Sequence, residues 1–315
     1  MNKADQRLVV ADSPQILRNI SVLSVFSSAA VPLVLAVALL TSSCGSFQPG
    51  VARASLPVQS APMAGGVAAA LTEERLNRLL PADAILLGEQ HDAAEHQQIH
   101  QQVVASLARR GLLAALVIEM ADTGSSTEQL RPGITATDAM VQQALDWNEK
   151  AWPWQAYAPA ILAAVQAGVP VVGANLPRAD MAAVMADGRL DTKLSGPALK
   201  AQQQAIRIGH CNALPESQIT PMTRIQIARD QHMADAIVHS AVPGKVVVLL
   251  AGSAHVNREL GVPLYLPATV QARVIALQAG GSSSASSVKQ TAGAYDGLWA
   301  TAAVPEKDYC AAFRK

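Results

Sequence analysis

The feature that most constrains this sequence is a short apolar run that ends in glycine and is followed at once by two reactive side chains. The run reads Ala84-Ile-Leu-Leu-Gly-Glu-Gln-His91, and a helix-like stretch extends from Asp92 to Arg110. A run this short, closed by glycine, predicts a buried strand that leads into a helix. Ligands of open α/β sheets sit beyond the carboxyl ends of the strands. Glu89 and His91 are therefore candidate site residues, although a helix cap and an ion pair would also account for them.

The same arrangement recurs along the chain. The apolar run 114–120 carries Glu119 near its end, and the run 245–251 leads into Gly-Ser-Ala and then His255. Three further strands are predicted at residues 169–174, 271–277 and 297–301. Alternating strands and helices predict an α/β fold with a mostly parallel central sheet flanked by helices. The stretch 177–242 shows no convincing strand, and it predicts a helical insertion or lid.

Polar residues at the ends of separate strands predict one site. If the strands that begin near residues 84, 114 and 245 are neighbours, then Glu89, His91, Glu119 and His255 converge at one sheet edge. Two carboxylates and two imidazoles suit a divalent metal, general acid–base chemistry or the anchoring of a charged ligand. The sequence contains no GxSxG elbow, Walker A loop or GxGxxG fingerprint, so the enzyme classes that these motifs mark are not indicated.

The N-terminal segment has the pattern of an export signal. Basic residues precede the apolar run 20–40, which ends in Leu-Thr-Ser-Ser directly before Cys44. Small residues ahead of the cysteine favour a bacterial lipoprotein signal peptide over residues 1–43, with lipid such as palmitate on Cys44; a transmembrane anchor is the alternative. Residues 44–66, rich in Gly, Pro, Ser and Ala, predict a flexible tether, and residues 67–315 a single α/β domain.

The remaining cysteines and the charge balance narrow the function further. With Cys44 lipidated, Cys211 and Cys310 remain, and an exported, oxidising compartment favours a disulfide between them. Only His210 lies near either cysteine as a possible zinc partner, so a shared metal is less favoured. The formal net charge is zero. Without a basic excess, nucleic acid is not an expected partner.

An aromatic cluster is the last unusual feature. Trp147, Trp152, Trp154 and Tyr157 fall within eleven residues of a chain that is only 3% aromatic. Such side chains could line the face of a planar ligand, or they could wedge a helix onto the sheet. Because Pro153 restricts the residue before it, we expect the aromatics to straddle a helix boundary.

Several short motifs, taken in order, resemble one family. They are Gly88-Glu-Gln-His91 with His96, Val117-Ile-Glu-Met120, Trp154 with Tyr157, Gly173-Ala-Asn-Leu-Pro-Arg178, Ala228-Arg-Asp230, Leu250-Ala-Gly-Ser-Ala-His255 and Gly261-Val-Pro263. Together they resemble the ChaN family of haem-binding, iron-regulated bacterial lipoproteins, within the wider Tiki and erythromycin-esterase-like superfamily. The resemblance extends from about residue 71 to the C-terminus.

The resemblance implies a haem-binding lipoprotein in haem and iron acquisition. Such a protein would sit in the cell envelope, lipid-anchored at the outer membrane and facing the periplasm, as a homodimer holding two haems face to face. Haem iron needs an axial ligand such as His or Tyr, in an apolar and aromatic pocket. Tyr157, near Trp154, is the first candidate for that ligand by resemblance, and Tyr265, His91 and His255 are the second.

The same residues leave a second function open. Relatives in the superfamily use the matching Gly-x-x-His, glutamate and distal histidine for hydrolysis. Glu89, His91, Glu119 and His255 are thus expected either to bind the cofactor or to form a metal-dependent hydrolase site, esterase or protease-like. In the hydrolase, His91, Glu119 and His255 would be catalytic.

Overall fold

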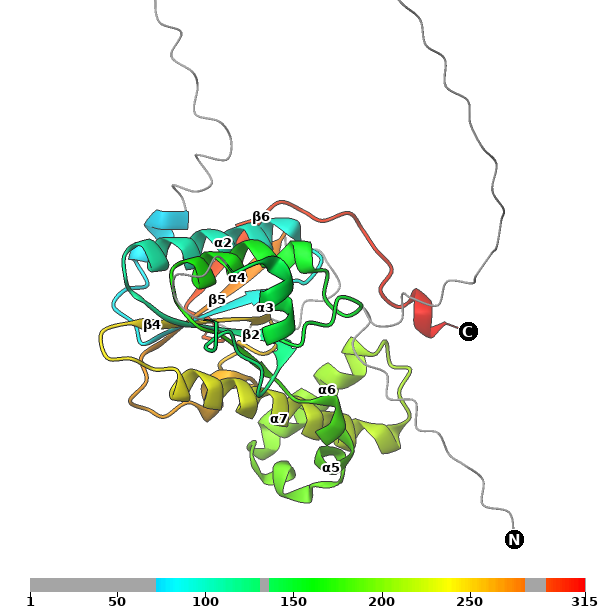
Figure 1. The fold of residues 1–315 in the computed structure, drawn as a ribbon. Helices are drawn as coiled ribbons and strands as arrows, with labels where there is room; N and C mark the ends of the chain where they lie inside the picture. Colours follow the sequence, from blue (N-terminus) through cyan, green and yellow to red (C-terminus); the bar gives the residue numbers. More distant parts are fainter. Residues whose placement is uncertain (1–71, 131–135, 281–292, 315) are drawn as a thin grey trace, which may run out of the picture.

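A six-stranded sheet forms the centre of the molecule. The computed structural model describes residues 72–130, 136–280 and 293–314. The strand order is β3-β2-β4-β1-β5-β6, and all neighbouring strands pair in parallel. The predicted parallel sheet and its six strands are confirmed (Figure 1). Their bounds are β1 Ala84–Glu89, β2 Leu113–Asp122, β3 Val171–Asn175, β4 Val246–Gly252, β5 Ala272–Ala279 and β6 Gly297–Thr301.

Helices cover both faces of the sheet, as predicted. On one face lie α2 (Ala94–Arg109) and α4 (Trp154–Gln166), with α3 (Asp138–Ala144) at their margin, and on the other lies α7 (Glu216–His239) (Figure 1). Successive side chains of β1 alternate between the faces, because strand side chains point to opposite sides. Ile85 and Leu87 pack toward α2 and α4, whereas Leu86 packs toward α7.

Local backbone features set the ends of two helices. Helix α3 ends at Ala144, shortly before Asp146 adopts a left-handed φ of 45°. The turn after it is closed by the indole N–H of Trp147, which donates to the Trp152 carbonyl at 3.0 Å. Helix α4 begins directly after Pro153, so the aromatic residues straddle a helix start, as expected.

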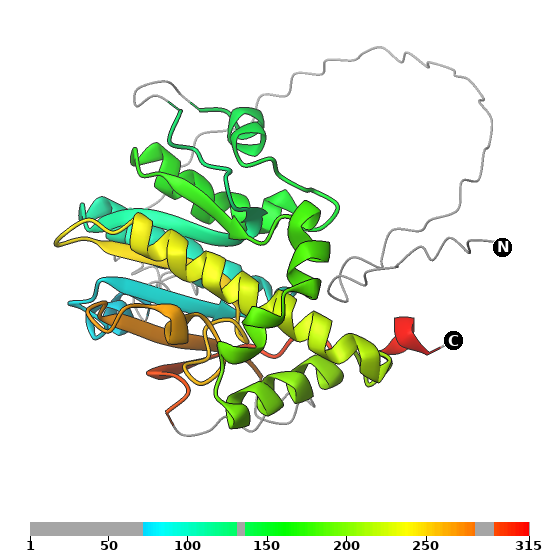
Figure 2. The same ribbon diagram turned by 90° about the horizontal axis from the view of Figure 1, so that it is seen from below.

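The predicted helical insertion is present between β3 and β4. It comprises α5 (Met181–Ala186), α6 (Gly196–Gly209), two short 3-10 turns and the first part of α7 (Figure 2). This lid has its own apolar cluster, which includes Leu176, Leu190 and Ile225. Arg224 on α7 fastens the lid further, because its guanidinium binds both Asp191 carboxylate oxygens at 2.7 and 2.8 Å.

The chain ends in a segment that returns to the lid. Residues 302–314 follow β6 and finish in the short 3-10 turn η5 (Ala311–Phe313). Cys310 forms a disulfide with Cys211, which confirms the predicted pair. Across the described ranges, every helix is too short or too polar to span a bilayer. The predicted signal peptide, Cys44 and the tether 44–66 lie outside the described residues.

Candidate functional site

The central strands bring the predicted residues to one edge of the sheet. β4 lies between β2 and β1, and its terminal residue Gly252 pairs with Glu89 at the end of β1. Glu119 lies near the end of β2, and the loops after β1 and β4 carry His91 and His255. The expected convergence of Glu89, His91, Glu119 and His255 is therefore found.

Glu89 is the centre of a hydrogen-bonded cluster on the α2 and α4 side. One of its carboxylate oxygens accepts hydrogen bonds from His91 Nδ1 and from the Tyr157 hydroxyl, both at 2.7 Å. The other accepts from the Gln97 amide at 2.8 Å, and His100 Nδ1 lies 3.6 Å away. Burial alone would raise the pKa of Glu89, but the bond and charge of His91 outweigh it and the pKa is lowered. Glu89 is thus held as a buried anion.

A second cluster lies on the α7 side, because Glu119 points to the opposite face from Glu89. One Glu119 oxygen accepts from the Gly252 backbone N–H at 2.7 Å, and the other lies 3.4 Å from His255 Nε2. His255 Nδ1 lies 2.6 Å from an Asp230 carboxylate oxygen. His255 is consequently clamped between two buried carboxylates.

The charges of this second cluster follow from its burial and its partners. Burial lowers the pKa of His255, yet the two neighbouring carboxylates prevail and raise it to about 10. Burial raises the pKa of Asp230 to about 6 despite the attraction of His255. Burial opposes ionisation of Glu119 too, but the positive His255 keeps its pKa well below the usual range. At neutral pH His255 is therefore an imidazolium, which cannot accept a further proton.

His91 lies between the two clusters and is the most accessible of the four residues. Its side chain is 23% exposed, whereas those of Glu89, Glu119 and His255 are between 0% and 7% exposed. A methyl group at Gly252 would lie 3.0 Å from His91 Nε2 and 3.6 Å from a Glu119 oxygen, so this glycine leaves open the space between the clusters. The Trp152 ring packs edge-on against the imidazole at 4.9 Å between centroids.

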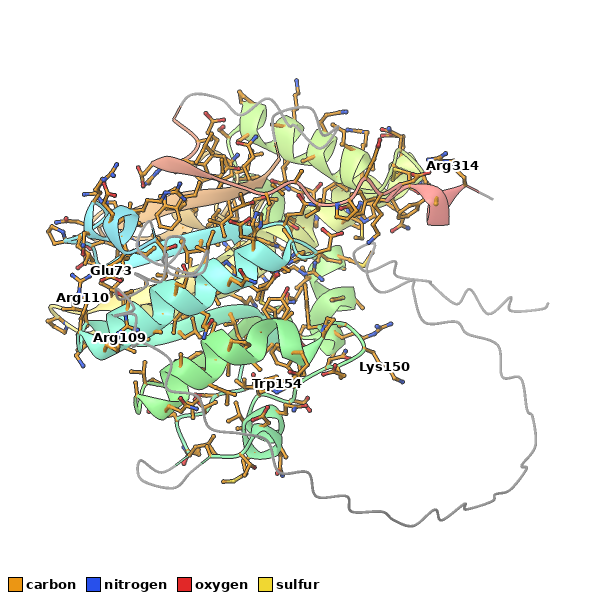
Figure 3. The ribbon with its side chains drawn as sticks, turned by 90° about the horizontal axis from the view of Figure 1, so that it is seen from above. Glu73, Arg109, Arg110, Lys150, Trp154 and Arg314 are labelled. Carbon is orange, nitrogen blue, oxygen red and sulfur yellow. A yellow bond between two sulfur atoms is a disulfide. The ribbon has the colours of Figure 1, made fainter. Side chains whose placement is uncertain are left out.

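Other predicted residues take supporting positions. Tyr157 is buried, and its hydroxyl donates to Glu89. Trp154, at the start of α4, is buried too (Figure 3). Its indole N–H donates to Asp138 at 2.8 Å. Trp152, rather than Trp154, thus lies beside His91. The Tyr265 hydroxyl is buried and hydrogen-bonds to none of the residues that the structure describes, and burial raises the pKa of Tyr265.

Two site residues, Gln97 and Asp230, were not predicted as site residues, and a third, His100, was considered only as an unfavoured metal ligand with His96, whereas it lies beside Glu89. Each lies on the buried face of a helix, and its position on that face is visible in the sequence from the spacing of the apolar residues. On α2, Gln97 and His100 share a face with the core residue Val104 at spacings of three and four. On α7, Asp230 shares the face of Ile227 and Ala234. A polar side chain at a core position of an amphipathic helix is the pattern that would have revealed them.

The arrangement does not form a ligand set for an isolated metal ion. Over the three described ranges, His, Cys, Asp and Glu side chains do not gather in threes in a way that could hold one. Glu89 and Glu119 point to opposite faces of the sheet, and each is already bound to its own imidazole. The chemistry that remains available at the edge is that of the His91 imidazole.

Comparisons with known proteins place these features in a family. The family described as haem-binding uptake, Tiki superfamily, ChaN matches residues 75–266, a range that contains both clusters. A solved structure described as cofacial heme binding to ChaN of Campylobacter jejuni is 27% identical, with a TM-score of 0.54, and covers 65% of this chain and 85% of that chain. No curated protein matches.

Two further solved structures are more distant. The type III effector HopBA1 and a mutant erythromycin esterase in its open conformation are each 14% identical, with TM-scores of 0.38. Each match covers 66% of this chain; it covers 82% of the HopBA1 chain and 72% of the erythromycin esterase chain. Because the family match spans more than half of the sequence and includes the whole of the site, the chain belongs to the ChaN haem-binding uptake family of the Tiki superfamily.

Proposed function

We propose that this protein binds haem at the carboxyl edge of its sheet, with His91 as the axial ligand to iron. The main support for the proposal is the hydrogen bonding of the two His91 ring nitrogens. Its Nδ1 is bonded to Glu89 at 2.7 Å, and no described residue hydrogen-bonds to Nε2. A carboxylate on one ring nitrogen fixes the tautomer and directs the lone pair of the other toward a metal. His91 thus offers the imidazole ligand that haem iron requires.

The surroundings of His91 also suit a flat, apolar macrocycle. Trp152 packs against the imidazole and against Tyr157, and Trp147 packs against Tyr157 and Trp154. This interlocked aromatic wall is rigid, because Trp147 and Trp154 also hold their indole N–H groups in hydrogen bonds. Gly252 adds no side chain beside Nε2. The residues present therefore fit haem as a bound cargo.

The three other candidates fit the ligand role less well. The Tyr157 hydroxyl is buried and donates a hydrogen bond to Glu89. If Tyr157 bound iron, Glu89 would lose this hydrogen bond, at a cost of about 1–3 kcal/mol for a buried group. His255 has carboxylates beside both ring nitrogens. The Tyr265 hydroxyl has no hydrogen-bond partner among the described residues, and it lies buried on the α7 side; Tyr265 is therefore the comparison for His91.

Haem titration of the purified protein tests the proposal. We expect a saturable Soret shift with the native protein. His91→Ala should change the Soret maximum and weaken binding by about tenfold or more, because the axial bond is lost, while Tyr265→Phe should leave both unchanged. The absence of any saturable shift with the native protein would overturn haem binding. A spectrum altered by Tyr265→Phe but not by His91→Ala would reassign the ligand and leave haem binding standing.

The cell-envelope role forms the second part of the proposal. A lipid anchor at Cys44 would hold the domain at the outer membrane facing the periplasm, where captured haem serves iron acquisition, and two copies would hold their haems face to face. The apolar run 20–40 before the cysteine supports the anchor. Mass spectrometry of the mature protein should find an acylated N-terminal Cys44, and Cys44→Ala should abolish the acylation. An unmodified, uncleaved N-terminus in the native protein would overturn the anchor.

The described residues favour binding over hydrolysis. His255, one of the two bases that a hydrolase was expected to use, is protonated at neutral pH by its carboxylate neighbours. The expected divalent ion has no three-residue ligand set in the described ranges. We therefore do not propose a hydrolase.

A further inference from the structure

We propose that the C-terminal segment 302–314 is a strap that positions the loop carrying His91, and that the Cys211–Cys310 disulfide holds this strap in place. The inference concerns how the proposed haem ligand is oriented, so its functional part rests on the proposed function. The segment lies beyond residues 75–266, the range that the family shares. It is therefore a feature of this chain rather than of the family match.

The strap contacts both neighbours of His91. The Gln90 amide donates to the Tyr309 hydroxyl at 3.1 Å, and that hydroxyl donates to an Asp92 carboxylate oxygen at 2.9 Å. Lys307 Nζ lies 3.3 Å from the same Asp92 oxygen. Tyr309 is more than two hundred residues away in sequence, yet it bridges the residues before and after the ligand. Tyr309 is therefore the positioning residue of the strap.

A second set of bonds fixes the end of β6 and the first residue of the strap to His96 and Glu95 of α2. The backbone N–H of Gln90 donates to His96 Nδ1 at 2.9 Å, so the other ring nitrogen carries the proton and donates to Thr301 Oγ1 at 2.9 Å. The backbone N–H of Ala302 donates to a Glu95 carboxylate oxygen at 2.7 Å. Burial lowers the pKa of His96, which keeps the ring neutral and suited to accept from Gln90. The loop 90–92 is thus held by Tyr309 and Lys307 of the strap and, through His96, by Thr301 at the end of β6.

The disulfide attaches the strap covalently, whereas the polar bonds hold it only by weak, reversible contacts. Cys310 directly follows Tyr309, and Cys211 lies just after α6, so the bond fixes the far end of the strap to the lid. Beyond it, Phe313 packs edge-on against His210 at 6.4 Å, and the chain runs on to Arg314 beside the lid (Figure 3). Single hydrogen bonds at the protein surface each add little stability, and terminal segments held by such bonds alone fray readily.

Breaking the disulfide should therefore loosen the loop that carries His91. Reduction by a small dithiol transfers two electrons and two protons to the two sulfur atoms; the dithiol closes to its own disulfide, and Cys211 and Cys310 become thiols. The strap then keeps only its polar bonds, and Tyr309 spends part of its time away from Gln90 and Asp92. The orientation of the ligand becomes coupled to the redox state of a bond on the lid.

Hydrogen exchange in the haem-free protein tests the strap directly. In the double variant Cys211→Ser/Cys310→Ser, backbone exchange over residues 89–97 should rise by about threefold to tenfold relative to the native protein, and Tyr309→Phe should raise it in the same direction. Arg314→Gln is the matched control, because Arg314 is on the strap but pairs with Asp308 rather than with the loop. Native protein treated with a dithiol provides the same comparison without substitution.

Haem dissociation then tests the functional part. The double variant should release haem about threefold to tenfold faster than the native protein, while Arg314→Gln should not differ from it. Unchanged exchange over residues 89–97 in both the double variant and the reduced native protein would overturn the strap. Unchanged exchange in Tyr309→Phe alone would overturn the role of Tyr309. If the native protein binds no haem, the proposed function fails, but the exchange result still decides whether the strap positions the loop.

Discussion

At the scale of single residues, Gly252 determines the space beside the proposed ligand. A methyl group there would lie 3.0 Å from His91 Nε2, closer than an ordinary contact, and the backbone of Gly252 is not in the left-handed region that favours glycine. We therefore expect Gly252→Ala to weaken haem binding by about tenfold while changing the free energy of unfolding by less than about 1 kcal/mol. Haem titration and urea unfolding measure the two effects.

Gly196→Ala on the lid is the control for this substitution, since within the described part of the chain no atom outside the helix of Gly196 lies within 4 Å of a methyl group there. It should leave haem affinity unchanged. Equal affinity of Gly252→Ala and the native protein would show that haem does not approach His91 from this side.

The pKa of His255 makes a second prediction at this scale. The pKa rises from 6.5 to about 10 on folding, so the stabilisation is fully present below pH 6.5 and is lost as the pH rises through about 10. We expect the free energy of unfolding of the haem-free protein to fall by a few kcal/mol across that window. In His255→Gln this fall should be smaller, because, of the pair His91 and His255, only His91, whose pKa Glu89 also raises, still loses a stabilising proton as the pH rises; urea unfolding at successive pH values measures the fall. A native protein equally stable at pH 7 and pH 10 would contradict the clamped imidazolium.

At the residue scale, the sequence predicted those site residues whose position is set by the backbone of a strand or of the loop directly after it. Glu89, Glu119 and the loop residues His91 and His255 were predictable, because parallel strands deliver their carboxyl ends to one edge. Asp230, the partner of His255, was missed. Its polar side chain on the buried face of α7 was the sequence signal, but its place at the site depends on how α7 packs on the sheet. The choice between Trp152 and Trp154 likewise depended on where α4 begins, which single-residue patterns locate poorly.

At the scale of elements, the strands were easier to predict than the helix ends and the strap. A fully buried parallel strand such as β4 reads as a continuous apolar run, a pattern that is hard to miss. The end of α3 depended on the left-handed Asp146, which no periodicity reveals. Residues 302–314 make mainly polar bonds to distant residues and have no repeating apolar pattern. The attachment of this segment to the lid was predicted only from the cysteines, because Cys211 and Cys310 are the two that remain besides Cys44.

The lid gives the prediction that belongs to this scale. Arg224 joins α7 to Asp191 through two hydrogen bonds and to the Met185 carbonyl at 2.7 Å, and its side chain is only 17% exposed. Arg224→Ala should raise hydrogen exchange over residues 181–192 and destabilise the protein by about 1–3 kcal/mol, because a partly buried carbonyl and carboxylate lose their donor.

The exposed pair formed by Arg207 and Glu216 is the matched comparison, since the Glu216 side chain is 76% exposed. Arg207→Ala should change the free energy of unfolding by no more than about 1 kcal/mol. Arg224→Ala could instead change the free energy of unfolding as little as Arg207→Ala and leave hydrogen exchange over residues 181–192 unchanged. That result would show that the apolar cluster alone holds the lid in its folded conformation.

At the scale of the whole molecule, the proposed ligand lies partly exposed at the carboxyl edge of the sheet. The His91 side chain is 23% exposed, and the Trp152 ring of the aromatic wall packs against it. A haem bound there would leave much of its other face in water, where apolar area costs about 25 cal/mol per Å². A second haem-loaded copy, stacked face to face, is one way to cover that area, as the family resemblance implies.

Sedimentation of the protein with and without haem tests this pairing. We expect the haem-free chain to sediment as a monomer and the haem-loaded chain as a dimer containing two haems, because the covered surface exists only after loading. His91→Ala should remain a monomer at haem concentrations that saturate the native protein, whereas Tyr265→Phe should dimerise normally. A haem-loaded native protein that stays monomeric at every concentration would show that the open face is covered within one chain, and the lid helices α5 and α6 would be the elements to probe for that cover.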